Sequence, residues 1–208
     1  MEATCWSDYL CPWCYLGQSR SALMERLGVT VVHLPFELHP EIPPAGRPIR
    51  IDGRLAPTFA RVAEECEAIG LPWRAPTRMP NTRRALETAE WVRVHHREAA
   101  PALHAAIFDA HMARGLAIDD PDVLDRLAER SQAPARDVRA AVEAGEASPL
   151  VDASMEAARV AGVSSTPTWV LDDGFQIPGA LDAATLERWV TKIVARRSPS
   201  SSGSSPTP

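Results

Sequence analysis

The chain has 208 residues, of which 45% are hydrophobic and 24% are charged, and its formal net charge at pH 7 is −5. This composition is typical of a globular chain that forms one domain, or one domain with an insertion, and that can bury a sizeable core. The negative charge and the isoelectric point near 5.7 argue against nucleic acid and anionic membranes as partners, and no apolar run approaches the ~18 residues of a transmembrane helix.

The first predicted elements are a short strand and a helix, and the motif Cys11-Pro12-Trp13-Cys14 stands where the strand ends and the helix begins. A helix N-terminus carries unpaired N–H groups and about half a positive charge, so it favours a thiolate. A thiol with a pKa of about 8.5 is about 3% ionised at pH 7, whereas a pKa of about 6 makes it roughly 90% ionised. We therefore expect Cys11 to be a reactive thiolate and Cys14, one turn later, to be the resolving thiol.

Two other interpretations of this motif are half of a zinc site and a passive structural disulfide. Zinc needs two further ligands at matching spacing, and Cys5 and Cys66 are solitary. A structural disulfide stabilises a chain mainly by closing a long loop, and this loop has two residues between the cysteines. We therefore favour redox chemistry without a metal, and we expect Cys5 and Cys66 to be passive, buried thiols.

The next stretch predicts a helix over Tyr15 to Leu27 with Gly28 as its C-cap, and then a strand from Val29 to Leu38. The order β-α-β matches the opening of a thioredoxin-type fold, for which a Cys-x-x-Cys motif is a reason to look. Prolines and glycines then crowd the segment from His39 to Pro57, which predicts a loop.

The middle of the chain, from about Thr58 to Gly162, predicts an insertion that is wholly helical and lacks strands. Three helix starts are signposted by Asn81, by Asp120 before Pro121, and by Ser148. The expected helices lie near 58–69, 82–98, 101–114, 121–131, 135–144 and 149–161. The resulting prediction is an α/β thioredoxin-like domain over 1–57 and 163–197, a helical insertion domain over 58–162, and a disordered tail over 198–208.

The sheet resumes at Gly162, where Gly162 to Leu171 predict a turn followed by a strand, and Asp172-Asp173-Gly174 predict a hairpin turn into the strand Phe175-Gln176-Ile177. Asp182 then caps a last helix. Its expected apolar face is formed by Leu186, Trp189, Val190 and Ile193.

The pair Thr166-Pro167 is the segment that we expect opposite Cys11. A proline directly before an apolar strand can be a trans residue that starts the strand, or a cis residue in a tight turn. A cis proline there has no N–H for its own strand, so neighbouring backbone groups stay free to bind an extended substrate. The order of elements around the motif favours the cis form.

Several motifs together resemble the DsbA-like thioredoxin superfamily, and within it the FrnE-like cytoplasmic branch. The motifs are Trp6-Ser7-Asp8-Tyr9-Leu10-Cys11-Pro12-Trp13-Cys14-Tyr15-Leu16-Gly17, Pro35-Phe36-Glu37-Leu38-His39-Pro40, Pro80-Asn81-Thr82, Gly162-Val163-Ser164-Ser165-Thr166-Pro167-Thr168 and Gly179-Ala180. The resemblance covers residues 2 to about 196. It implies a thioredoxin fold with a helical insertion, with Cys11 as nucleophile, Cys14 as resolving thiol and Pro167 as the cis proline after Thr166.

The resemblance also implies substrate contacts around the dithiol, from Pro12, Trp13, Thr166, His39 and Asn81. The chain departs from the family pattern in two places, since that pattern has an asparagine at the position of His39 and a histidine where Arg83-Arg84 stand. It also lacks the additional cysteine pair of some FrnE-like members.

A proton acceptor for Cys14 is expected as well, and Glu37 on the second strand is the candidate, although it can equally be an exposed strand carboxylate. His95, His96, His104 and His111 are expected on helix surfaces or at the domain interface.

The predicted function is thiol-disulfide exchange, as an oxidoreductase or isomerase. Its partners would be protein or small-molecule thiols and disulfides, with no cofactor unless glutathione is the redox partner, and with the chain a monomer or homodimer. The start of the sequence, which leads at once into the first strand, and the reducing chemistry favour a cytoplasmic location.

Three alternatives remain open. One is the related kappa-type glutathione transferase and 2-hydroxychromene-2-carboxylate isomerase group, which has a serine at the nucleophile position. The others are a peptide-binding chaperone that works without thiols and a tailoring enzyme with a small-molecule redox partner.

Overall fold

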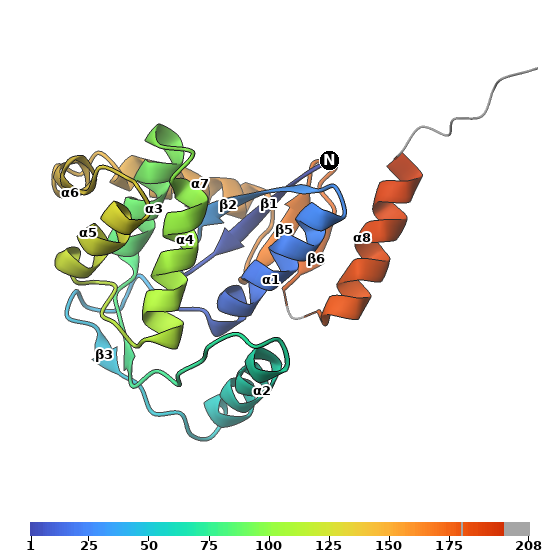
Figure 1. Cartoon of the computed structure of the whole chain (residues 1–208), viewed down its shortest axis with the longest axis horizontal. Helices are drawn as coiled ribbons and strands as arrows, with labels where there is room; N and C mark the ends of the chain where they lie inside the picture. Colours follow the sequence, from blue (N-terminus) through green and yellow to red (C-terminus); the bar gives the residue numbers. More distant parts are fainter. Residues whose placement is uncertain (180, 198–208) are drawn as a thin grey trace, which may run out of the picture.

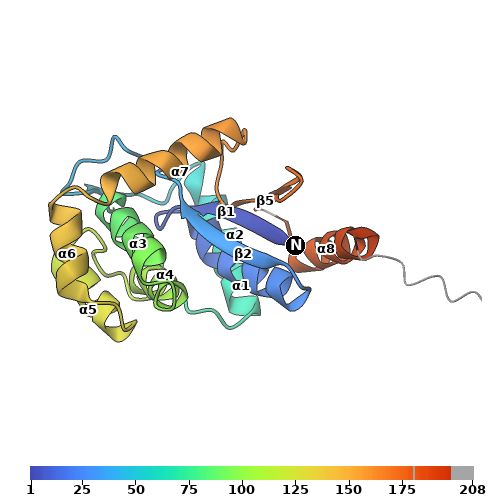
Figure 2. The ribbon, with the colours of Figure 1, turned by 90° about the horizontal axis from the view of Figure 1, so that it is seen from above.

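The computed structural model describes residues 1–179 and 181–197. The predicted tail over 198–208, and Ala180 of the Gly179-Ala180 pair, lie outside these residues. Within the described part, a small sheet is surrounded by helices, and most of the helices lie to one side of it (Figures 1 and 2).

A four-stranded mixed sheet forms the centre of the thioredoxin-like part, with the strand order β2-β1-β5-β6. β1 is parallel to β2 and antiparallel to β5, and β5 is antiparallel to β6. In this register Cys5 lies between His33 and Trp169. The strands are β1 (Glu2–Ser7), β2 (Thr30–Pro35), β5 (Thr168–Leu171) and β6 (Gln176–Pro178). The α/β thioredoxin fold expected from the sequence is therefore confirmed.

Helices cover both faces of this sheet. α1 (Pro12–Arg26) and α8 (Ala183–Arg197) pack against a cluster of apolar side chains on one face, and α7 (Ser148–Val160) covers the other (Figure 2). The buried Trp169 indole donates to the Ser21 hydroxyl of α1 at 3.0 Å. The buried Trp6 indole donates to the Ser154 carbonyl of α7 at 3.2 Å. Both buried indole N–H groups therefore have a hydrogen-bond partner.

The inserted segment packs against the beginning of α1 rather than forming a separate core. Leu86 and Phe108 of the insertion belong to the same buried cluster as Cys14 and Leu16. The helices of the segment are α2 (Leu55–Ala68), α3 (Arg83–His95), α4 (Ala100–Phe108), a π-helical turn (Asp109–Ala113), α5 (Pro121–Arg130), α6 (Ala135–Glu143) and α7. The dithiol therefore lies where the two parts meet, while the domain boundaries at 57/58 and 162/163 stay a prediction.

The prediction of a loop over 39–57 and of no strand over 58–162 is wrong at one point. β3 (Arg47–Pro48) and β4 (Arg78–Met79) form a two-residue antiparallel pair. The Arg78 guanidinium fixes this pair, because it donates to the carbonyl of Ala45 at 2.5 Å and binds the carboxylate of Asp119. Such a pair has too few residues to show any apolar periodicity.

Several element ends also differ from the prediction. The strand expected to reach Leu38 ends at Pro35, the helix expected over 82–98 ends at His95, and the next one becomes π-helical at Asp109. Ser148 lies inside the first turn of α7, where its hydroxyl donates to Glu87 at 2.6 Å instead of capping the helix. In these places a tertiary contact or a change in backbone pattern outweighs the local propensity.

The strongest local signals are confirmed. The Asp120 side chain accepts from the N–H of Asp122 at 2.9 Å, and Asp182 accepts from Thr185 at 2.8 Å. Gly28, at φ +86°, ends α1 as expected. On the expected apolar face of α8, Leu186 and Val190 are buried and Ile193 packs beside them, whereas Trp189 is 38% exposed and contacts the Phe175 ring.

Candidate active site

Cys11 is the N-cap residue of α1, with φ −82° and ψ 115°, and Pro12 occupies the first turn of the helix. The Cys14 amide donates to the Cys11 carbonyl at 3.1 Å, which places the two cysteines on one turn. Both are free thiols, and only 7% of Cys11 and 3% of Cys14 are exposed. β1 leads into the motif and the core of the insertion packs behind it, so the pair is held at the junction of the two parts.

The two thiols have opposite proton affinities. The pKa of Cys11 is lowered, chiefly because the Cys14 thiol hydrogen-bonds to its sulfur, and this outweighs the effect of burial. The pKa of Cys14 is raised well above its ordinary value, first because it is buried and then because of its contact with Cys11. Ionisation is thus directed to the sulfur at the helix start.

The Thr166–Pro167 peptide bond is cis and faces the dithiol. The Cys11 thiol donates to the Thr166 carbonyl oxygen at 3.4 Å. Within the described chain the Thr166 hydroxyl is buried without a hydrogen-bond partner in the resting structure, yet it lies close enough to lower the pKa of Cys11. This hydroxyl is therefore available to stabilise a negative sulfur.

Two glycines allow the close packing around Pro167, Gly17 on α1 and Gly179 after β6. A Cβ atom added at Gly179 would lie 2.2 Å from the Pro167 carbonyl oxygen, and one added at Gly17 would lie 3.2 Å from the Pro167 Cγ. Gly17 and Gly179 both occur in the motifs that resemble the family. The structure gives a steric reason for glycine at these two positions, because a larger residue would contact Pro167.

Asp8 is a site residue that the sequence analysis did not single out. Its buried carboxylate accepts from the amides of Leu10 at 3.0 Å and Leu38 at 2.8 Å. Burial nevertheless raises the pKa of Asp8 to about 6, and its charge in turn raises the pKa of Cys11. Only its position three residues before Cys11 could have indicated a role.

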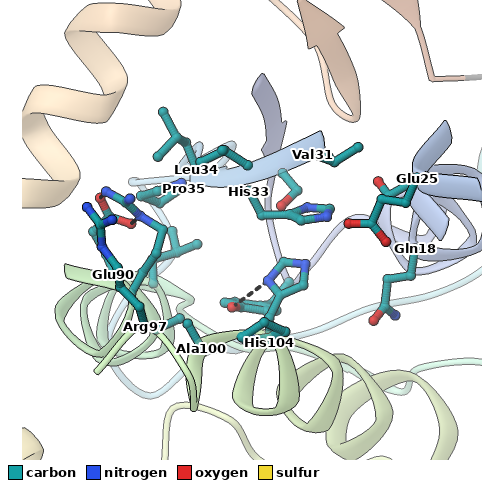
Figure 3. Close-up of a pocket in the computed structure, with 18 of the residues that line it drawn as sticks. Gln18, Glu25, Val31, His33, Leu34, Pro35, Glu90, Arg97, Ala100 and His104 are labelled. Carbon is teal, nitrogen blue, oxygen red and sulfur yellow. Dashed lines mark hydrogen bonds and ion pairs between the residues drawn. The ribbon is translucent and has the colours of Figure 1, made fainter. Parts of the chain in front are cut away.

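The remaining cysteines and histidines have different surroundings, and Cys5 is near enough to Cys11 for the charge of Cys11 to raise the pKa of Cys5. Cys5 and Cys66 are buried, as expected. His95 and His96 lie beside the Trp91 ring, whereas His104 lies at the domain interface beneath His33 (Figure 3). His111 is buried in the π-helical turn, so it does not lie on a helix surface.

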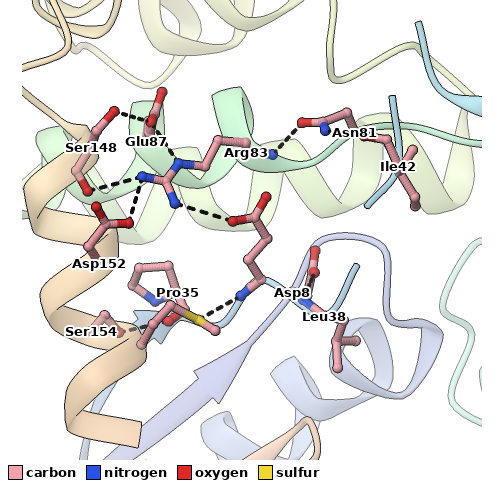
Figure 4. A network of polar contacts seen from close by, with 12 residues as sticks. Asp8, Pro35, Leu38, Ile42, Asn81, Arg83, Glu87, Ser148, Asp152 and Ser154 are labelled. Atoms are coloured by element: carbon pink, nitrogen blue, oxygen red, sulfur yellow. Dashed lines mark hydrogen bonds and ion pairs between the residues drawn. The ribbon is translucent and has the colours of Figure 1, made fainter. Parts of the chain in front are cut away.

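Glu37 is held in a network of charges that centres on Arg83 (Figure 4). Its carboxylate accepts from the Arg83 guanidinium at 3.2 Å, and the same guanidinium binds Glu87 and Asp152, each at 2.8 Å. This network joins the loop after β2 to the first turns of α3 and α7. Glu37 therefore has a structural partner, and the buried carboxylate whose charge acts on the dithiol is that of Asp8.

Among the predicted substrate-binding residues, Trp13 lies at the site with the Arg61 guanidinium 5.0 Å from its ring centroid. The His39 imidazole instead pairs with Glu41 at 2.9 Å. The Asn81 side chain donates to the Ile42 carbonyl at 2.6 Å and accepts from the Arg83 amide at 3.0 Å. The amide of Asn81 is thus engaged in holding the loop and the start of α3, and the expected substrate contacts of Asn81 and His39 stay predictions.

Two surveys of the described residues complete the site. They contain no group of three or more His, Cys, Asp or Glu side chains arranged to hold a metal ion. None of the described helices has the length and apolar character needed to cross a bilayer.

Comparison with known proteins identifies the fold. A model of the DSBA-like thioredoxin domain matches residues 3–190. The probable DsbA oxidoreductase SCO1869 from Streptomyces coelicolor superimposes with a TM-score of 0.84 and 26% identity, over 96% of this chain and 92% of the other. A 2-hydroxychromene-2-carboxylate isomerase superimposes with a TM-score of 0.79 and 20% identity, over 94% of this chain and 97% of the other. The uncharacterized protein YwbO from Bacillus subtilis is 23% identical over 190 residues, which cover 89% of this chain and 94% of YwbO.

Proposed function

The chain belongs to the family of DSBA-like thioredoxin domains, an oxidoreductase family, and from this premise we propose that it exchanges disulfides through Cys11 and Cys14. The observation that carries the proposal is the contrast between the two thiols: the pKa of Cys11 is lowered and that of Cys14 is raised, on one turn of α1. A nucleophilic thiolate paired with a protonated resolving thiol is the arrangement that exchange requires.

The reaction begins when the Cys11 thiolate attacks a substrate disulfide in line. A bond forms between Cys11 and one substrate sulfur, and the other substrate sulfur leaves as a thiolate. Cys14 then loses its proton and attacks the Cys11 sulfur, which releases the second substrate thiolate. The substrate gains two electrons, and Cys11 and Cys14 become a disulfide; the reverse sequence oxidises a dithiol.

Asp8 is the proposed proton acceptor for Cys14, in place of Glu37. A group whose pKa is raised to about 6 is mostly ionised at pH 7 and close enough to neutrality to exchange protons with a thiol. Glu37 is instead bound by Arg83 at 3.2 Å. The Thr166 carbonyl, beside the Cys11 sulfur, is placed to receive an amide of an extended substrate once Cys11 has lost its proton.

The proposal includes protein or small-molecule disulfides as partners, with Trp13 and the nearby Arg61 forming one flank of the docking surface. Glutathione is the candidate redox partner, and a reducing, cytoplasmic environment suits a transient Cys11–Cys14 disulfide. A FrnE-like role and a monomeric or homodimeric state belong to the same proposal.

Insulin reduction by the purified chain with dithiothreitol tests the proposal. Cys11→Ser should abolish the activity, and Cys14→Ser should accumulate the mixed disulfide. Cys66→Ala should keep the wild-type rate, because the charges that act on the buried Cys66 thiol are those of Arg20 and Glu65 and not that of the dithiol. Wild-type activity in Cys11→Ser would sink the proposal. Activity that requires glutathione and survives in Cys14→Ser would favour the alternative, a glutathione-dependent isomerase or transferase.

A further inference from the structure

A cavity of about 570 Å³ lies between the sheet and the helical insertion (Figure 3). Residues of β2 and α1 form one side of it and residues of α3 and α4 the other, and neither Cys11 nor Cys14 lines it. Its volume is within the roughly 300–1,000 Å³ of small-molecule sites. The proposed exchange reaction leaves this space without a role.

Two neighbouring imidazoles, from His33 and His104, line the cavity. The ring centroids of His33 and His104 are 4.4 Å apart, and the Tyr9 hydroxyl is 3.0 Å from the His104 Nδ1. The remaining inner nitrogens, Nδ1 of His33 and Nε2 of His104, are buried and have no hydrogen-bond partner within residues 1–179 and 181–197. Buried nitrogens of this kind are normally satisfied, so they indicate an occupant with hydrogen-bonding groups.

The imidazole pair suits an occupant that both donates and accepts. A neutral imidazole has one N–H donor and one acceptor nitrogen, and the Tyr9 hydroxyl can take either role toward His104. The pKa of each histidine is lowered by burial, so both rings are neutral at pH 7. A peptide group, which offers one N–H and one C=O side by side, matches this pair.

The charges at the two ends of the cavity are opposite in sign. Glu2 and Glu25 lie at one end, and neither forms an ion pair with any described residue. Arg97 lies at the other end, likewise without an ion pair in the described chain, whereas its neighbour Arg93 is bound to Glu90 at 2.6 Å. Figure 3 shows Glu25 and Arg97 on opposite sides of the histidine pair. An ammonium group suits the first end and a carboxylate the second.

We propose that this cavity binds a short peptide of two or three residues with free ends, a ligand distinct from the disulfide substrate. Its ammonium group lies at Glu25, its carboxylate at Arg97, and a peptide group bonds to His33 and His104. Apolar side chains of the peptide contact Val31, Leu86 and Pro101, which complete the walls.

Histidine NMR on the full-length chain tests the proposal with a defined probe. The probe is an equimolar mixture of tripeptides Gly-X-Gly with free ends, in which X is each standard residue except cysteine, so that no thiol reaches the dithiol. The ring Cε1–H resonances of His33 and His104 should shift saturably, while those of His95 and His96 should not. Variants His33→Gln and His104→Gln assign the resonances and should weaken binding, and His95→Gln is the control.

Capped probes and charge variants test the two ends. N-acetylation or C-amidation of the mixture should each raise the Kd about two- to fivefold, the range for one exposed ion pair. Glu25→Gln should weaken only peptides with a free amine, and Arg97→Gln only those with a free carboxylate. Glu187→Gln and Arg136→Gln, at exposed positions outside the cavity, should change nothing.

Two results would overturn the proposal: the absence of any saturable shift at His33 and His104, or equal binding of the free and the doubly capped mixtures. The same titration on Cys11→Ser should reproduce the wild-type shifts, because no catalytic sulfur touches the cavity. Failure of the peptide site is therefore distinguishable from failure of the exchange reaction.

Discussion

The dithiol site and the interface between sheet and insertion around His33 are packed in opposite ways. At the dithiol, Pro167 lies so close to Gly179 that a Cβ there would come within 2.2 Å of its carbonyl oxygen. Around His33 and His104 the same interface leaves a cavity of about 570 Å³.

The difference shows what burial does to a titratable group in each setting. Burial alone drives a group toward its neutral form, which is the state of both histidines. Cys11 keeps a lowered pKa because hydrogen bonds from nearby groups outweigh burial. Hydrogen bonds to a buried group thus favour its charged form, and burial without them favours its neutral form.

The largest expected effect is a loss of folding stability in acid, caused by the buried histidines around the cavity. The folded pKa of His33 is about 4 against 6.5 ordinarily, so the unfolded chain takes up a proton at higher pH and stability is lost as the pH falls from 6.5 toward 4. At about 1.4 kcal/mol per pH unit this amounts to up to about 3 kcal/mol. His104 and His111 act in the same direction.

Asp8 opposes part of this loss, because its folded pKa is raised to about 6 and its protonation below that pH favours the folded chain. Urea unfolding as a function of pH measures the net slope. We expect His33→Phe, which keeps a ring at the stack, to flatten the slope and the exposed His95→Phe to leave it unchanged. A wild-type stability that stays constant between pH 6.5 and 4 would contradict this account.

Adding a methyl group at a glycine that contacts Pro167 should lower the stability of the fold. Gly179→Ala forces a clash with backbone, for which we expect a loss of about 3 kcal/mol, the upper end for overpacking. Gly17→Ala meets only the Pro167 ring at 3.2 Å and gains helix propensity, so its net change should stay within about 1 kcal/mol. Chemical denaturation gives both values. Equal losses would mean that Pro167 is not held by the backbone approach at Gly179.

The smallest expected effect is a change in the pKa of Cys11 when the charge of Asp8 is removed. Because the Asp8 carboxylate raises the pKa of Cys11, Asp8→Asn should move the midpoint of Cys11 alkylation to lower pH. Glu37→Gln is the matched control, since the Glu37 charge is balanced by Arg83. Iodoacetamide rates as a function of pH measure both variants, and a larger shift in Glu37→Gln would reverse the assignment of the two carboxylates.

The parts of the fold that local residues decide could be predicted. The Cys11 helix start, the Asp120 cap and the turn at Gly174 each depend on a few neighbouring residues. The position of Thr166 beside Cys11, 155 residues away, was inferred only from the order of elements and the family resemblance. The DsbA-like resemblance itself is confirmed by the matching domain model.

What the prediction missed depends on distant contacts. Arg78 binds Asp119 and thereby holds β4. Arg83 binds Glu37, the carboxylate that the sequence predicts as the proton acceptor for Cys14. No periodicity or motif connects residues that meet only after the insertion has folded onto α1.

The sequence by itself determined the dithiol, its place at a helix start and the thioredoxin order of elements, because these follow from neighbouring residues. Only the tertiary structure decided the surroundings of the buried groups: the Asp8 charge acts on Cys11, Glu37 is bound by Arg83, and the neutral His33–His104 pair lines a cavity. The physical reason is that proton affinity depends on the water excluded and the donors supplied by residues remote in the chain.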